Sequence, residues 1–154
     1  MKKILSVFVF RTVIALLFVS SANAMPDDIL TEVKSSIAAR YPDNYSMQKT
    51  LIDGQIESYE FLQNYYPSSV PSDVFDKIKA SIESRYPYNF SMQKTLIQGQ
   101  VESYEFLENY TPDDVPNDVF GRIKEKIISR YPYNFSMQKT LIEGQVKSYL
   151  ELNR

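Results

Sequence analysis

Apolar residues return at helical spacing in three places along the chain, each time just after a proline. In the first series they are Ile29, Leu30, Val33 and Ile37. Positions three or four apart share one face of a helix, so each series predicts an amphipathic helix of about 13 residues. The later series are Val74, Phe75, Ile78 and Ile82, and Val119, Phe120, Ile123 and Ile127.

Each of these helices is expected to end at an Arg-Tyr-Pro step, because the residue before a proline is displaced from helical dihedral angles. The acidic and polar residues after the preceding proline are typical of capping side chains at a helix start. Asn44, Asn89 and Asn134 are N-cap candidates for a longer second helix, expected from about Tyr45 to Tyr65 in the first unit. Short corners join antiparallel helices, so each unit is predicted to be an αα-hairpin.

The hairpin is repeated at a fixed period. The stretch from Arg40 to Ile52 recurs almost letter for letter 45 residues later, and again after another 45. Positions 71–109 match positions 116–154 at 27 of 39 residues. Such periodicity predicts an all-α fold of three tandem hairpins, forming a short α-solenoid or a six-helix bundle in one domain. The units are 25–70, 71–115 and 116–154.

The second helix of each unit is covered on more than half its circumference, as expected for a helix between neighbours. Gly54 and Ser58 lie one turn apart on one edge of the covered face, together with Met47, so a neighbouring helix is predicted to cross there. Ser46 and Lys49 belong to the polar strip and are expected to face water.

One position on that edge changes in the last unit. Phe61 and Phe106 are replaced there by Glu151. Because a terminal repeat has no successor to cover its edge, the charge is expected to act as a solubilising cap. Replacing Glu151 by Phe is therefore predicted to promote oligomerisation.

Residues 1–24 have the features of a secretory signal peptide, with two lysines near the start, an apolar run over 12–19 and a small-x-small cleavage site at 22–24. The alternative is a retained membrane anchor. However, Arg11 interrupts the segment, and the run after it is much shorter than the roughly 20 residues of a spanning helix. The mature protein is expected to begin at Met25 without a stable membrane anchor, in the periplasm or outside the cell.

Composition excludes several classes of function. Removing the three basic residues of the leader leaves 14 basic and 19 acidic side chains, a net charge of −5 that argues against nucleic acid as a partner. Without histidine or cysteine, the chain lacks the usual nucleophile systems and the thiolate and imidazole zinc ligands. There is no glycine-rich phosphate loop either, and no cofactor is expected.

A Ser-x-x-Lys motif occurs in each unit, first as Ser46 and Lys49. This spacing resembles that of the serine and lysine of penicillin-recognising enzymes, but their companion motifs are absent as a set. The motif is expected to be a polar first helical turn. The alternative is a small exported enzyme using Ser-Lys chemistry or carboxylates such as Glu57 and Glu60.

Two glutamines, Gln48 and Gln55, interrupt the apolar arc of the second helix in line with Tyr59. A buried amide without a partner costs about 1–3 kcal/mol. Such groups either bond across helices, for instance to loop carbonyls around Tyr41 and Pro42, or line a groove for an extended ligand such as a peptide. The candidate set is Gln48, Gln55, Tyr59, Gln93, Gln100, Tyr104, Gln138, Gln145 and Tyr149.

The core Tyr-Pro-x-Asn-Phe-Ser-Met-Gln, followed by Ile-x-x-Gln-x-x-Ser-Tyr, resembles a helical-hairpin segment of small exported bacterial proteins of unknown role. The two-helix period also resembles HEAT-type and tetratricopeptide-type solenoids in architecture. These resemblances imply a fold and no activity. The expectation is an exported, non-enzymatic interaction protein that binds a protein or peptide partner, with a homo-oligomer left open.

Overall fold

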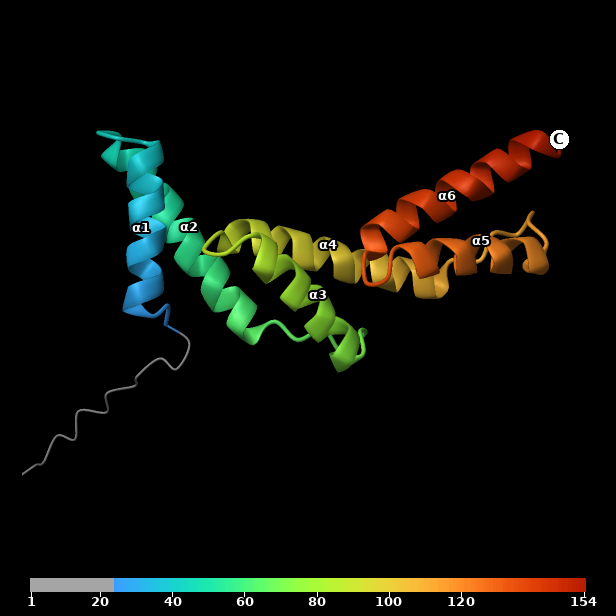
Figure 1. Ribbon diagram of the computed structural model, residues 1–154, viewed down its shortest axis with the longest axis horizontal. Coiled ribbons are helices and arrows are strands. Elements are labelled where there is room, and N and C mark those ends of the chain that lie inside the picture. The colour runs from blue at the N-terminus through green and yellow to red at the C-terminus, as the bar shows by residue number, and fades with distance from the viewer. Residues whose placement is uncertain (1–23) are drawn as a thin grey trace, which may run out of the picture.

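The computed structural model describes residues 24–154, which form six helices and no strand (Figure 1). This confirms the predicted all-α fold of repeated hairpins. The predicted signal peptide lies outside the described residues except for Ala24. The helices are α1 (Asp27–Arg40), α2 (Tyr45–Asn64), α3 (Ser72–Arg85), α4 (Phe90–Asn109), α5 (Asn117–Arg130) and α6 (Phe135–Leu152).

The long helices form the spine of the molecule. Helix α2 contacts α4 and α4 contacts α6, while α1, α3 and α5 each pack only on the long helix of their own hairpin among the described residues. The first and third hairpins therefore lie at opposite ends of an elongated array (Figure 1). We call the contact between consecutive long helices, α2 with α4 or α4 with α6, a junction.

The corner inside each hairpin follows the local chemistry of its sequence. Helix α1 ends at Arg40, before the Tyr41-Pro42 step, and Asp43 then adopts the left-handed conformation with φ 61°. The side chain of Asn44 accepts a hydrogen bond from the backbone N–H of Met47 at 3.2 Å, capping α2. The same cap opens α4 and α6, so all three predicted asparagine caps are confirmed.

The start of the first helix in each hairpin differs from the prediction. The prolines before α1, α3 and α5 occupy the N-cap position, and none of these helices has a side-chain cap hydrogen bond. Asp27, Asp73 and Asp118 lie inside the first turn instead. The prediction of capping side chains was therefore wrong. The carboxylates instead stabilise the helices by interacting favourably with the positive end of the helix dipole.

The buried residues form two clusters along the array. One extends through the first two hairpins and includes Val33, Ile78 and Ile97, and the other fills the third hairpin around Ile142 and Val146. A core divided in this way is typical of stacked repeats, which bury apolar surface against their neighbours. None of the helices in 24–154 is long and apolar enough to cross a membrane.

Candidate functional site

The first glutamine of each repeat bonds within its own hairpin. Gln93 Nε2 donates to the carbonyl oxygen of Tyr86 at 2.8 Å, and the backbone N–H of Asn89 donates to the same oxygen at 3.2 Å. Gln48 and Gln138 make the equivalent bond at 2.7 Å. The predicted bond to the corner carbonyl is thus present in every hairpin, where it ties the long helix to the turn before it.

The second glutamine joins consecutive hairpins. Gln55 Oε1 accepts from the backbone N–H of Ser91 at 3.1 Å, and Gln55 Nε2 donates to Asn89 Oδ1 at 3.4 Å. Gln100 makes the same two contacts with the start of α6, at 3.2 and 3.3 Å. The first N–H groups of a helix have no partner within it, so each of these glutamines supplies a cap from the preceding hairpin.

Serines of the long helices lie inside the same junctions. Ser91 Oγ donates to the carbonyl oxygen of Gly54 at 3.2 Å and lies 3.2 Å from Ser58 Oγ. Ser136 repeats both contacts against α4, with Ser103 Oγ again 3.2 Å away. The predicted crossing at Gly54 and Ser58 is confirmed. The expectation that the motif serine faces water holds only in the first hairpin, because Ser91 and Ser136 are half-buried.

The candidate tyrosines pack edge-on against the start of the next long helix. The rings of Tyr59 and Phe90 have centroids 5.1 Å apart and planes at 85°. Tyr104 and Phe135 repeat this contact at 5.1 Å and 90°. Edge-to-face aromatic pairs of this kind stabilise an interface beyond the area they bury. Both tyrosines therefore contribute to holding consecutive hairpins together.

The motif lysines of the second and third hairpins lie over aromatic rings. Lys94 Nζ is 4.5 Å from the centroid of Phe61, and Lys139 Nζ is 4.2 Å from that of Phe106. Both lysines are half-buried, so the expectation that they face water was wrong. A cation over a ring face adds attraction across the junction.

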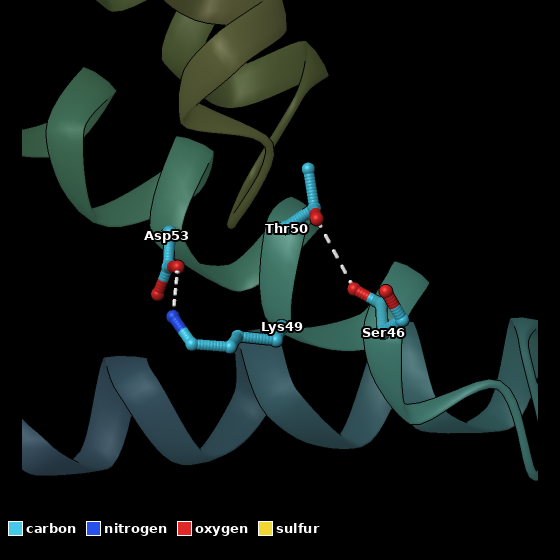
Figure 2. A network of polar contacts seen from close by, with 4 residues as sticks. All are labelled: Ser46, Lys49, Thr50 and Asp53. Atoms are coloured by element: carbon cyan, nitrogen blue, oxygen red, sulfur yellow. Dashed lines mark hydrogen bonds and ion pairs between the residues drawn. The ribbon is translucent and has the colours of Figure 1, made fainter.

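In the first hairpin the Ser-x-x-Lys motif separates its two side chains. Lys49 Nζ lies 2.5 Å from the Asp53 carboxylate, and the backbone carbonyl of Ser46 accepts from the Thr50 hydroxyl at 3.1 Å. Figure 2 shows the lysine side chain extended away from Ser46 and toward Asp53. The amine is not brought to the serine hydroxyl, so this geometry does not favour a Ser-Lys nucleophile.

In the last repeat, the candidate residues are not covered by a following hairpin. Gln145 is exposed on α6, and no helix of residues 24–154 covers it. Tyr149, one turn further on, is half-buried. A ligand groove along the whole set stays a prediction, and the amide of each of the other five glutamines already has a hydrogen-bond partner within the protein.

Burial is the main cause of the raised pKa of three tyrosines, Tyr65, Tyr104 and Tyr110. Burial raises the pKa of Tyr65, and the nearby carboxylates of Glu105 and Glu102 raise it further. The pKa of Tyr110 is raised in the same way, by burial and then by Glu143. Within the described residues, no group of three or more acidic side chains is placed to hold a metal ion.

Three exposed methionines were missed by the sequence analysis, which placed Met47 on a covered edge. Met47, Met92 and Met137 are 43%, 41% and 41% exposed. Each lies three residues after a capping asparagine, in the first turn of a long helix. Their presence at the same position of all three repeats was the sequence signal that could have identified them.

Comparisons with protein families, with curated proteins and with solved structures each found no match. The resemblance to exported helical-hairpin proteins therefore stays a prediction.

Proposed function

We propose that the chain is an exported, non-enzymatic repeat protein that binds a protein or peptide partner through surface presented at the same place on each hairpin. The observation that supports this most directly is the set of three exposed methionines. Large apolar side chains left in water at equivalent positions of successive repeats are typical of binding surfaces.

The exposure of these methionines is independent of their neighbours. The first, second and third hairpins have different surroundings, yet the exposed fraction of the methionine varies only between 41% and 43%. By contrast, the position two residues earlier is 73% exposed as Tyr45 and 8% exposed as Phe90. The junctions therefore do not bury the methionine, whereas they do bury the aromatic residue two positions before it.

The chemistry of methionine suits this role. Its unbranched thioether adapts to differently shaped partners and makes favourable contacts with aromatic rings. Here the side chain is carried on the capped first turn of a helix whose corner is tied by Gln48, Gln93 or Gln138. A partner would therefore contact flexible apolar side chains whose backbone is held in place by the capped helix and its corner.

The repeated arrangement also favours an extended partner. Three equivalent surfaces on one elongated array permit several weak contacts to act together, because contacts after the first become intramolecular. A peptide or extended protein segment uses such an array better than a small compact ligand does. The contacts of Lys49, Lys94 and Lys139 described above favour this binding role over Ser-Lys catalysis.

The experiment replaces all three methionines by serine. The wild-type chain is used to capture partners from the extracellular or envelope fraction of the source cells, with quantitative mass spectrometry as the readout. We expect the triple variant to lose the wild-type partners by about tenfold or more, as removal of an interface centre does. The changes are Met47→Ser, Met92→Ser and Met137→Ser.

A matched control changes three exposed threonines on the second turn of the same helices, while keeping the hydroxyl that bonds the backbone. Circular dichroism checks that both variants remain helical. Undiminished capture by the methionine variant would refute the proposed surface. The control changes are Thr50→Ser, Thr95→Ser and Thr140→Ser.

A further inference from the structure

The third hairpin leaves open a surface that, in each of the other two hairpins, faces the corner of the next hairpin. Between α5 and α6 lies a groove of about 430 Å3, lined by apolar side chains, by Gln145 and by the basic side chains Arg122, Lys126 and Arg130. In the first and second hairpins the equivalent surface faces the corner of the following hairpin, residues 85–89 and 130–134. The lining of the open groove includes Val119, Ile123, Ile127, Tyr131, Leu141 and Gln145.

The first hairpin carries the complementary surface, also uncovered. The start of α2 has the same capped corner as α4 and α6, with no preceding long helix among residues 24–154. Tyr45 is 73% exposed, whereas Phe90, its equivalent in α4, is buried against Tyr59. One end of the array therefore presents the acceptor half of a junction and the other end presents the inserting half.

The two junctions inside the chain have the same geometry. The serine hydroxyl oxygens are 3.2 Å apart in both, the aromatic centroids are 5.1 Å apart in both, and the glutamine bonds differ by 0.1 Å. A third junction of this kind needs only a hairpin with a capped corner placed beyond α6. The first hairpin of a second copy meets that requirement.

The charges at the two ends support such a pairing. Inside the chain, Lys94 lies over Phe61 and Lys139 lies over Phe106. In a junction between copies, the same two positions are Lys49 and Glu151. The cation would therefore meet a carboxylate in place of an aromatic ring, and opposite charges attract.

At a second pair of positions, a basic and an aromatic residue inside the chain correspond to a basic and an acidic residue in the contact between copies. Lys77 Nζ on α3 donates to the Tyr133 hydroxyl, in the corner before α6, at 2.8 Å, which joins the second hairpin to the third. In a junction between copies, the equivalent positions are Arg122 and Asp43. Both side chains are exposed in the single chain, and Arg122 pairs there with Asp118 on its own helix. At both pairs of positions, an aromatic residue that contacts a lysine inside the chain is replaced by an acidic residue in the contact between copies.

We propose that the third hairpin of one copy binds the first hairpin of another, reproducing the internal junction head to tail. Gln145 then accepts from the backbone N–H of Ser46, and Tyr149 packs against Tyr45. Glu151 pairs with Lys49, and Arg122 with Asp43. The pair retains one free end of each kind, so the contact can continue into chains of copies. This association uses surfaces distinct from the exposed methionines.

Cysteine cross-linking tests the arrangement directly, because the chain contains no cysteine of its own. The full chain carrying Ser46→Cys is mixed with the full chain carrying Ser148→Cys under mild oxidation. We expect a linked pair containing one copy of each variant, because the equivalent serine oxygens lie 3.2 Å apart in both internal junctions.

The controls use exposed and internal positions. Ser35→Cys, on the exposed surface of α1, replaces the Ser46 variant in a matched mixture, and about tenfold less linked pair is expected there. Ser103→Cys with Ser136→Cys in one chain should close within the chain and verifies the geometry. Equal yields from the two mixtures, with the internal pair closing, would overturn the proposal.

Charge reversal with sedimentation velocity gives an independent test. The wild type is expected to sediment faster as its concentration rises, and Glu151→Lys to weaken this association about tenfold through like-charge repulsion with Lys49. Adding Lys49→Glu should restore it. Glu151→Phe recreates the internal contact of a lysine over a ring, so it should promote association as the sequence predicts, although Glu151 is proposed here as a contact residue rather than a solubilising cap. Glu125→Lys on α5 makes the same change in net charge away from the contact.

The outcomes of that experiment are separable. Loss with Glu151→Lys and recovery with the double variant support the head-to-tail contact. Equal weakening by Glu125→Lys would mean that net charge alone governs association, and would overturn it. A wild type that stays monomeric at every concentration, together with equal cross-linking in the two mixtures, would also overturn it.

Discussion

The starts of α2 and α4 have almost the same sequence and very different surroundings. Both begin with a capping asparagine, an aromatic residue, Ser-Met-Gln-Lys and Thr. In α4 this turn lies against the middle of α2, and its Phe90 is buried. In α2 no helix precedes it within the described residues, and Tyr45 is exposed.

Some hydrogen bonds of this motif form within a single hairpin, and others require the preceding long helix. The asparagine cap and the glutamine bond to the corner carbonyl form in both hairpins. The bonds of Ser91 to Gly54 and Gln55 form only where a preceding helix is present. The corner is therefore specified locally, and the junction is an additional contact that should be removable without unfolding the corner.

The largest expected difference concerns the aromatic position. Phe90→Ala removes a buried ring from the junction and is expected to lower the free energy of unfolding by about 3–5 kcal/mol. Tyr45→Ala changes the equivalent exposed position and should alter it by about 0.5 kcal/mol or less. Urea unfolding at low protein concentration, followed by circular dichroism, measures both. Equal losses would show that α2 does not hold the start of α4.

A smaller difference is expected for the glutamines that cap the next hairpin. Gln100→Leu leaves the backbone N–H of Ser136 without its partner in a half-buried position, and should cost about 1–3 kcal/mol. Gln145→Leu changes the same position on the open face of α6 and should cost about 0.5 kcal/mol or less. The same unfolding experiment compares them, and a cost for Gln145→Leu as large as that for Gln100→Leu would contradict the capping role.

The parts of this architecture that depend on local chemistry could be predicted from the sequence. The period gives the number of hairpins, the Tyr-Pro step gives the end of the first helix, and asparagine gives the start of the second. The small residues Gly54 and Ser58 indicate where a neighbour crosses. Apart from the period, which is found by comparing repeats, each of these inferences needs only residues within one repeat.

The parts that depend on the offset between hairpins could not be predicted. A helical wheel gives the direction of a side chain but not how far the next helix is displaced along the axis. The wheel therefore placed Met47 under cover and Ser91 in water, whereas the structure exposes the methionine and half-buries the serine. The capping of α4 by Gln55 depends on the same offset, because it links residues 36 apart.

The smallest expected effect concerns two tyrosines at the ends of α2 and α4, where consecutive hairpins also meet. Tyr65 stacks on Phe61 at 4.9 Å and lies edge-on to Phe75 at 5.9 Å. Tyr110 has the same surroundings 45 residues later. Burial, followed by nearby glutamates, raises the pKa of both hydroxyls above the model-peptide value of 10.0.

A tyrosine whose pKa is raised by folding contributes stability that is complete below its unfolded pKa and is lost as the pH rises through the folded value. We therefore expect the urea midpoint to fall as the pH rises above about 10. The double variant Tyr65→Phe and Tyr110→Phe keeps both rings but cannot ionise, so its midpoint should fall less. Tyr66→Phe alters an exposed ring nearby and should behave as the wild type. If the double variant and the wild type lose stability in parallel, these tyrosines do not couple the hairpins to pH, and the alkaline loss arises elsewhere in the array.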